Sequence, residues 1–438
     1  MSLVRSRMPR LLGALLATIL VVGLLGGCGA SSQSAPQPSQ SSAPKASESS
    51  KPAASSQPSA SASAPASAPA APKDPIKIGV ILTTSGPIGP IGNKQMMGLT
   101  MAVEDINAAG GIMGRKVELI QRDDAGDPTK ALTTAQELVE KQGVTLVVAS
   151  TLSSPALAIL PYFTEQKVFS LGSQTSDAAN DPKKYPYGFT AQPLASVQAQ
   201  VVVRYAVDVM KVSKVGILVE ATAMGKSTAD AYKKELEGKG LQPVAVEQIP
   251  QGAQDVTAQL NNLRKAGSEM LMTATLGADS VRIIKNLKTM GWDVPMLGNS
   301  DLFTAVVVDG AGPENMQKVY AYNPARLSFS DKTPPPAKAK EFAAKLAKRL
   351  NLPTLKDAFQ QESVFYDIMY IIKAGVEKAQ STEGPKVAAA VETFKGFDGV
   401  QAAYTFDKDS HAGQRVDQEV LIKAASLKEG FFEMAPGY

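Results

Sequence analysis

The chain has 438 residues, with 45 Lys and Arg against 41 Asp and Glu, one histidine and one cysteine. A single cysteine excludes an intramolecular disulfide, and so few His and Cys residues exclude a transition-metal centre built on them. Residues 1–73 hold six basic residues and one acidic residue, which leaves 39 basic and 40 acidic residues in the 365-residue body at 74–438. This near-neutral body argues against nucleic acid as a partner, and its length suits two domains.

Residues 1–28 have the pattern of a secretory signal that ends in a lipidation site. Three arginines within residues 5–10 precede an apolar run at 11–25, which is shorter than the roughly 20 residues of a membrane-spanning helix. The run ends in Gly-Gly-Cys and looks like a bacterial lipobox, in which the cysteine is lipidated. We therefore expect an exported protein whose Cys28 anchors it at the outer face of the cytoplasmic membrane, in the periplasm or at the cell surface.

Residues 29–73 consist almost entirely of Ser, Ala, Pro and Gln. A segment with almost no large apolar side chains to bury does not fold, so we expect a disordered linker between the anchor and the body. Such a coil would span roughly 35–40 Å.

From residue 76 the sequence alternates short apolar runs with longer amphipathic segments. The apolar, β-branched runs predict buried strands, and the amphipathic segments with capping residues predict helices. Asp127 as N-cap and Pro128 at the first helical position mark one helix start. The first round comprises strands at 76–83, 116–122, 144–149 and 168–171, and helices at 93–109, 128–141 and 155–166.

The same alternation restarts after a stretch rich in proline and tyrosine at 181–193. Repeated β-α-β units predict parallel sheets covered by helices on both faces, and two rounds predict two Rossmann-like α/β lobes. The second round comprises helices at 196–209, 228–239, 253–265 and 279–290, and strands at 215–219, 243–248, 270–275 and 295–297. Helices at 336–350, 358–379 and 384–393 and strands at 319–322, 402–406 and 419–425 follow.

Motifs for catalysis, nucleotides or metals are incomplete. His411 is the only possible histidine base and lies in a polar turn at 409–413, where we expect it to be exposed to solvent; no Gly-x-Ser-x-Gly elbow is present. The segment 220–227 ends in Gly-Lys-Ser like a phosphate-binding loop, but Glu220 stands at its first required glycine and would repel phosphate. The acidic run at 123–127 suits a helix start better than a cation site. We predict no enzyme, no cofactor and no metal site.

Two polar loops follow neighbouring predicted strands of the first round. Ser153 and Ser154 follow one strand, with Ser154 expected as a helix N-cap, and the run at 172–177 follows the next strand. Open α/β sheets bind ligands at the carboxyl ends of their strands, and helix N-termini favour anions such as a carboxylate. The alternative interpretation is that these hydroxyl groups only cap helices.

Residues 76–130 resemble the N-terminal lobe of the leucine/isoleucine/valine-binding protein family, the solute receptors of branched-chain amino-acid ABC transporters. The resemblance extends over 74–438 and implies a type I binding fold, in which two hinged lobes are joined by three crossovers near 190–193, 321–324 and 400–404. The matching pieces are Ser85-Gly86-Pro87, Glu104-Asp105-Ile106-Asn107 with Gly110-Gly111, Asp123-Asp124 with Asp127-Pro128, Ser153-Ser154, Gln174-Thr175-Ser176, and Phe397-Asp398-Gly399 with Phe406-Asp407.

The resemblance implies lobe 1 at 74–191 and 324–399, and lobe 2 at 192–323 and 400–438. Ser153 and Thr175 match family positions that hold the ligand carboxylate, next to Ser154 and Ser176. Gln174 matches a position that contributes its backbone.

Other positions depart from the family pattern. Ile91 and Met224 stand where the family often has aromatic rings. The acid that pairs with a ligand ammonium falls on or next to Ser300, where Asp301 is the nearest carboxylate. Tyr366 and Gln361, near the start of the helix predicted at 358–379, could also face the cleft, with core packing as the alternative for Tyr366.

The resemblance implies a monomeric solute-binding subunit of an ABC importer, which closes on a small carboxylate-bearing solute such as a branched-chain amino acid and delivers it to permease subunits. Two alternatives remain open. One is a sensory receptor that signals ligand occupancy to a membrane partner, and the other is a receptor for amides or aromatic acids.

Overall fold

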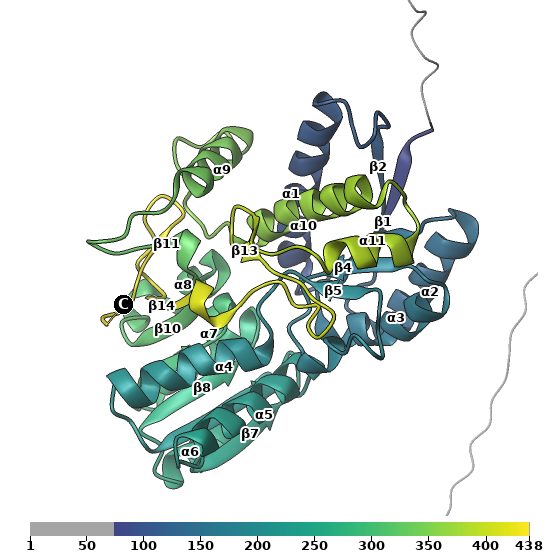
Figure 1. Cartoon of the computed structure of the whole chain (residues 1–438). Coiled ribbons are helices and arrows are strands. Elements are labelled where there is room, and N and C mark those ends of the chain that lie inside the picture. The colour runs from purple at the N-terminus through teal and green to yellow at the C-terminus, as the bar shows by residue number, and fades with distance from the viewer. Residues whose placement is uncertain (1–73, 438) are drawn as a thin grey trace, which may run out of the picture. The chain divides into compact units, whose positions relative to one another are not determined.

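The computed structural model describes residues 74–437, which form two α/β lobes, each built on its own sheet (Figure 1). The predicted signal peptide, Cys28 and the predicted linker lie outside the described residues. Within 74–437, none of the helices is both long enough and apolar enough to cross a membrane.

The first lobe contains a five-stranded sheet in the order β2-β1-β3-β4-β5, and all of its strand pairs are parallel. Apart from the edge strand β2, which also carries charged side chains, its strands are short and largely apolar, as expected for strands that are covered on both faces. They are β1 (Ile76–Leu82), β2 (Val117–Asp123), β3 (Leu146–Ala149), β4 (Phe169–Gly172) and β5 (Gly188–Thr190). The surrounding helices are α1 (Gly89–Ala108), α2 (Pro128–Gln136), α3 (Ser153–Glu165), α10 (Gln360–Ala379) and α11 (Gly384–Val391).

Alternate side chains of these strands enter two different cores. Val80 of β1 belongs to the core shared with α1, α10 and α11, whereas Ile81 belongs to the core shared with α2 and α3. The start of α2 confirms the predicted cap, because the Asp127 carboxylate accepts a hydrogen bond from the Lys130 N–H at 2.8 Å. The first lobe is therefore a three-layer α/β/α unit, as the sequence predicted.

The second lobe contains a six-stranded sheet in the order β14-β10-β9-β8-β6-β7. Five of its strands are parallel, but β14 is antiparallel to β10, which corrects the expectation of purely parallel sheets. The first residue of β14, Glu419, pairs with the last residue of β10, Pro324, so the two strands run in opposite directions. The strands are β6 (Val215–Glu220), β7 (Ala245–Ile249), β8 (Met270–Ala274), β9 (Met296–Gly298), β10 (Val319–Pro324) and β14 (Glu419–Lys423).

Helices cover both faces of this second sheet. One face carries α4 (Ala195–Arg204) and α5 (Ala223–Gly238), and the other carries α6 (Thr257–Lys265), α7 (Ala278–Thr289) and α8 (Ala305–Ala311). A further helix, α9 (Ala337–Arg349), packs in a separate apolar cluster with residues before α10. Two small sheets pair β11 (Ser328–Phe329) with β15 (Phe432–Glu433), and β12 (Phe397–Asp398) with β13 (Ala403–Tyr404).

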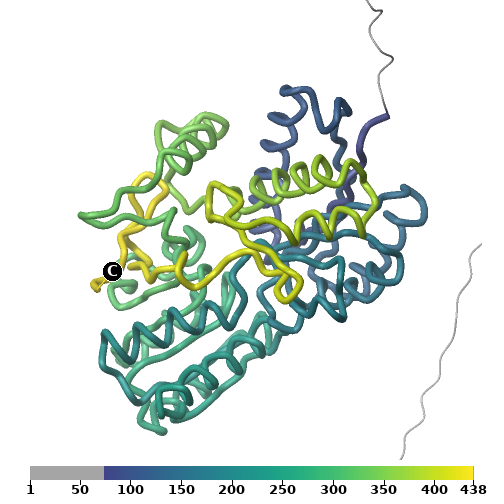
Figure 2. Tube along the Cα trace, in the orientation of Figure 1, coloured from purple at the N-terminus to yellow at the C-terminus, as the bar shows by residue number. Residues whose placement is uncertain are grey.

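The chain passes between the two sheets after β5, after β10 and before β14 (Figure 2). Two of these passages lie side by side, because Thr190 accepts a hydrogen bond from the Gly413 N–H and donates its own N–H to the His411 carbonyl, both at 2.9 Å.

His411 is not the solvent-exposed turn residue that the sequence predicted. Only 1% of its surface is exposed, because the turn folds back against β5 and its ring stacks on Phe189 with centroids 3.8 Å apart. Its ring nitrogens lie 3.0 Å from the Gly188 carbonyl and 2.9 Å from Glu392 Oε1. The only histidine of the chain is therefore a core residue of the first lobe.

Candidate functional site

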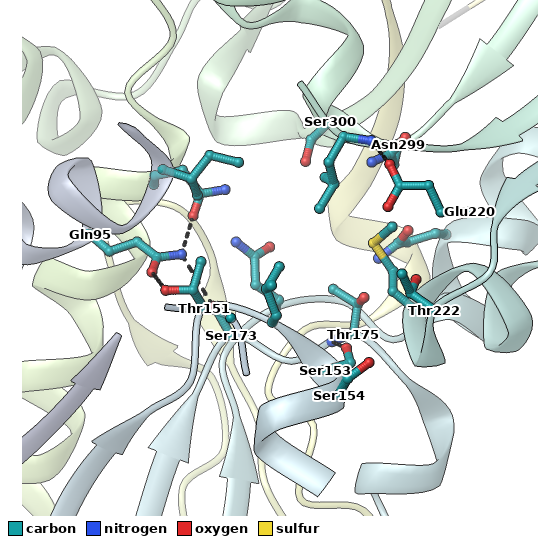
Figure 3. Close-up of a pocket in the computed structure, with 18 of the residues that line it drawn as sticks. Gln95, Thr151, Ser153, Ser154, Ser173, Thr175, Glu220, Thr222, Asn299 and Ser300 are labelled. Atoms are coloured by element: carbon teal, nitrogen blue, oxygen red, sulfur yellow. Dashed lines mark hydrogen bonds between the residues drawn. The ribbon is translucent and has the colours of Figure 1, made fainter. Parts of the chain in front are cut away.

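A cavity of about 820 Å³, including its mouth, lies where the carboxyl ends of strands from both sheets meet. Its first-lobe wall comes from the loops after β3 and β4 and from α1 and α10, and its second-lobe wall from the loops after β6, β7, β8 and β9. Figure 3 shows Ser153, Ser154 and Thr175 together on one side of this space and Glu220 on the other. This is the edge at which open α/β sheets bind ligands.

Ser153 is the first residue of α3 and has 5% of its surface exposed. Its Oγ accepts hydrogen bonds from the backbone N–H groups of Thr175 and Ser176, both at 3.2 Å. Because this oxygen already receives two donors, the hydroxyl hydrogen is free to be donated to another acceptor. A donor at the positive end of a 13-residue helix suits an anionic acceptor.

The residues after β4 divide between the cavity and the protein interior. Thr175 lines the cavity, but its amide and that of Ser176 are used by Ser153. Ser176 is buried and is not among the lining residues. Gln174 also turns inward, since its side-chain amide donates to the Phe189 carbonyl at 3.0 Å, and its backbone carbonyl accepts from Thr190 Oγ1 at 2.8 Å.

Ser154 lines the cavity but is not the N-cap that the sequence predicted, because α3 begins at Ser153, two residues before the predicted start, without a side-chain cap. The Ser154 Oγ instead accepts a hydrogen bond from the Ala223 N–H of the second lobe at 3.3 Å. Ile91 and Met224 both line the cavity and contribute apolar surface from opposite lobes.

Gln361 lines the cavity, as the sequence suggested, but sequence reasoning missed the Gln95 and Thr151 side chains that join it in a polar network on the first-lobe wall. Gln95 of α1 has 1% of its surface exposed and accepts a hydrogen bond from Thr151 Oγ1 at 2.7 Å. Its amide donates to Gln361 Oε1 of α10 at 2.9 Å, and both partners line the cavity. The sequence shows only a glutamine within the helix predicted at 93–109, and its burial, which requires hydrogen-bond partners, is seen only in the structure.

Glu220, the last residue of β6, was also missed as a site residue. None of its surface is exposed, and Oε1 accepts the Leu276 N–H at 2.5 Å, while Oε2 has no hydrogen-bond partner within the described residues. Burial raises the pKa of Glu220 to about 8, the Leu276 N–H lowers it, and the nearby Asp279 and Asp301 carboxylates raise it further. Among the residues that line the cavity, Glu220 is the only carboxylic acid, and none is Lys, Arg or His.

The conformation at Glu220 depends on the glycine that follows Met224. A Cβ on Gly225 would lie 1.9 Å from the Glu220 carbonyl oxygen, so only glycine lets the start of α5 approach the end of β6 this closely. Thr222 caps α5 by accepting the Gly225 N–H at 3.1 Å. The Gly-Lys-Ser run thus starts a helix beside a carboxylate.

The structure does not bring Asp301 or Tyr366 to this cavity. Asp301 lines a neighbouring cavity, and its Oδ2 accepts the Gly277 N–H at 2.8 Å and Ser280 Oγ at 2.9 Å. Tyr366 donates its hydroxyl to Asp105 at 2.7 Å, and its ring packs against Phe342 with centroids 5.0 Å apart. Across 74–437 there is no group of three His, Cys, Asp or Glu side chains that could hold a metal ion.

Comparison with known proteins gives one consistent family. Residues 75–418 match the family model described as periplasmic binding protein. Leu/Ile/Val-binding protein homolog 3 of Brucella melitensis is 29% identical over 314 residues, which cover 72% of this chain and 82% of that protein. A leucine-, isoleucine-, valine-, threonine- and alanine-binding protein of Pseudomonas aeruginosa is 25% identical over 325 residues, with 73% and 82% covered.

Solved structures share the same fold. The type 1 periplasmic binding protein from Bordetella pertussis superposes with a TM-score of 0.74 at 26% identity, over 83% of this chain and all of that one. A branched-chain amino acid transporter substrate-binding protein from Streptococcus pneumoniae, solved with isoleucine, gives a TM-score of 0.71 at 22% identity, over 82% and 99%. The chain therefore belongs to the periplasmic binding protein family, as a member of its leucine/isoleucine/valine-binding proteins with the type I fold.

Proposed function

We propose that this chain is the extracytoplasmic solute-binding subunit of an ABC importer and that its two lobes close on a small solute with a carboxylate or an equivalent polar acceptor. The observation that carries the proposal is the Ser153 hydroxyl, whose oxygen is occupied by two N–H donors and whose hydrogen remains to be donated at the start of α3. Thr175 supplies a second hydroxyl to the same wall. Ile91 and Met224 would contact the apolar part of the solute.

Contacts between the lobes support closure around the cavity. Ser154 accepts the Ala223 N–H at 3.3 Å, and Ser227 of α5 both accepts the Asp177 N–H at 2.9 Å and donates to its carboxylate at 3.0 Å. These hydrogen bonds lie near the cavity and join elements of different sheets, so opening the lobes would break them. A solute held by both walls would favour the closed arrangement.

The proposed cellular role follows from the family. The Pseudomonas relative is named for binding amino acids, and the Streptococcus protein is described as the substrate-binding protein of a branched-chain amino acid transporter. We propose that this chain likewise hands its solute to permease subunits, works as a monomer, and is exported and held at the membrane through lipid on Cys28.

A thermal-shift screen of the full chain in detergent tests solute binding. The compounds are amino acids, amides, and aliphatic and aromatic carboxylic acids. A solute at 100 times its dissociation constant stabilises the folded protein by about 2.7 kcal/mol, which is readily measured. We expect stabilisation by at least one carboxylate. If only compounds without a carboxylate or a comparable acceptor stabilise the protein, the site assignment is wrong.

A further inference from the structure

Glu220 is the one cavity-lining acid whose hydrogen-bonding capacity is unmet. An ionised carboxylate accepts several hydrogen bonds, but within the described residues Glu220 receives only the Leu276 N–H. Its fully buried Oε2 belongs to a side chain that Figure 3 shows turned toward the centre of the cavity from the second-lobe side. Leaving a buried carboxylate oxygen without a partner is costly, so this position is suited to a donor that the protein itself does not supply.

The other acids near Glu220 have donors for their carboxylates. Asp279 is paired with Arg282 at 2.6 Å and also accepts the Gly252 N–H, and Asp301 has two donors of its own. The cavity contains no basic residue that could neutralise Glu220.

We propose that Glu220, rather than Asp301, holds a protonated amine of the solute. The inference rests on the proposed function and deepens it: the Ser153 and Thr175 hydroxyls would hold the solute carboxylate from the first-lobe side, and the Glu220 carboxylate would hold the amine from the second-lobe side of the same cavity. An ammonium group brings three N–H donors and a positive charge, which matches an unpaired acceptor in a wall with no cations. The solute is then an amine-bearing carboxylate that is contacted by both lobes.

The affinity for an amine held by Glu220 should depend on pH. In the free protein the pKa of Glu220 is raised to about 8, so near pH 7 the carboxyl is mostly protonated. An ammonium binds the ionised form, so binding releases a proton, and affinity rises by up to about tenfold per pH unit as the pH approaches 8. The charged groups that act on Glu220 are Asp279 of α7 and Asp301 after β9, which both raise its pKa, and Tyr322 of β10 is the other titratable residue that lines the cavity.

The test compares matched probes on the full chain in detergent. The probes are L-leucine with 4-methylpentanoate and 3-methylbutylamine, and L-phenylalanine with 3-phenylpropanoate and 2-phenylethylamine, together with every compound that stabilises the parent in the wider screen. Calorimetry measures each affinity at pH 6, 7 and 8 for the parent, Glu220→Gln and Glu362→Gln. Glu362 is a matched control, because it is also buried, has an unpartnered Oε2 within the described residues and has a pKa raised to about 7, but does not line the cavity.

We expect the tightest solute to carry an amine and its amine-free analogue to bind more weakly. Glu220→Gln should weaken the amine-bearing solute by about 5- to 150-fold and abolish the dependence on pH, while Glu362→Gln should do neither. Tight binding of an amine-free acid that is unaffected by Glu220→Gln overturns the inference and leaves the proposed function standing. Binding that weakens with rising pH also overturns it, because the carboxyl would then act as a donor. If no compound binds the parent, the proposed function fails and the inference fails with it.

Discussion

At the scale of single residues, the hydrogen bonds that each lining side chain makes within the protein determine which donors and acceptors are left for a solute. Ser153 and Thr175 could be found from the sequence, because polar residues after parallel strands gather at one edge of a sheet. The different roles of the two side chains could not be predicted, because they depend on the two hydrogen bonds that Ser153 Oγ accepts from backbone N–H groups of the neighbouring loop. Glu220 stands at the end of an apolar strand, but its unmet oxygen is visible only when the facing loops are in place.

Removing either hydroxyl from the first-lobe wall should weaken solute binding. We expect Ser153→Ala and Thr175→Val each to cost about 1–3 kcal/mol, or roughly 5- to 150-fold in affinity, because a buried acceptor of the solute loses its donor. Calorimetry with the best solute measures the effect. Ser268→Ala is the control, since this buried hydroxyl bonds the Met270 carbonyl at 2.6 Å and does not line the cavity. Parent-like affinity in both variants would leave these loops with a structural role only.

Neutralising Glu220 should stabilise the solute-free protein at alkaline pH. The folded-state pKa of about 8 lies above the unfolded value of about 4.3, so the stability linked to this carboxyl is present below pH 4 and is lost as the pH rises through 8. Glu220→Gln removes that loss. We therefore expect its Tm at pH 8 to exceed that of the parent, with a smaller difference at pH 5. A Tm of Glu220→Gln below that of the parent at pH 8 would instead show that the carboxylate stabilises the fold.

At the scale of elements, the alternation of strands and helices was predictable because each segment carries its own periodicity and caps. The start of α5 was placed too late, at 228 instead of 223, because Thr222 and the close approach of Gly225 to Glu220 determine it. The burial of His411 and the antiparallel direction of β14 were not predictable. Both depend on contacts with segments that are far away in the sequence, such as Phe189 and β10.

The hydrogen bonds between α5 and the segment after β4 should change the affinity for the solute, although we expect neither residue to contact the solute. Ser227→Ala removes both hydrogen bonds between Ser227 and Asp177, which join the two lobes. We expect a faster release of solute and an affinity lowered by about 2- to 12-fold, the effect of roughly 0.5–1.5 kcal/mol. Stopped-flow measurement of the dissociation rate checks this. Lys226→Ala is the control, because Lys226 pairs only with Asp230 within α5; equal rates in both variants would remove Ser227 from the closing contact.

At the scale of the whole molecule, the body and the predicted anchor have separate roles. We expect Cys28→Ser to abolish attachment to the membrane, since Cys28 is the only cysteine that lipid could modify. The variant should still be stabilised by the same solutes, because Cys28 lies outside the folded residues 74–437. Membrane fractionation followed by a thermal-shift assay tests both parts. A variant that stays tightly bound to membranes would refute the anchor.

The central claim is that a solute closes both lobes around the cavity, and a measurement of molecular size tests it most directly. Small-angle X-ray scattering of residues 74–438 should show a smaller radius of gyration at saturating solute than without solute, because rigid lobes rotate toward each other about their connecting segments. The Ser153→Ala variant should require more solute for the same change. An unchanged radius of gyration at saturating solute would contradict the account.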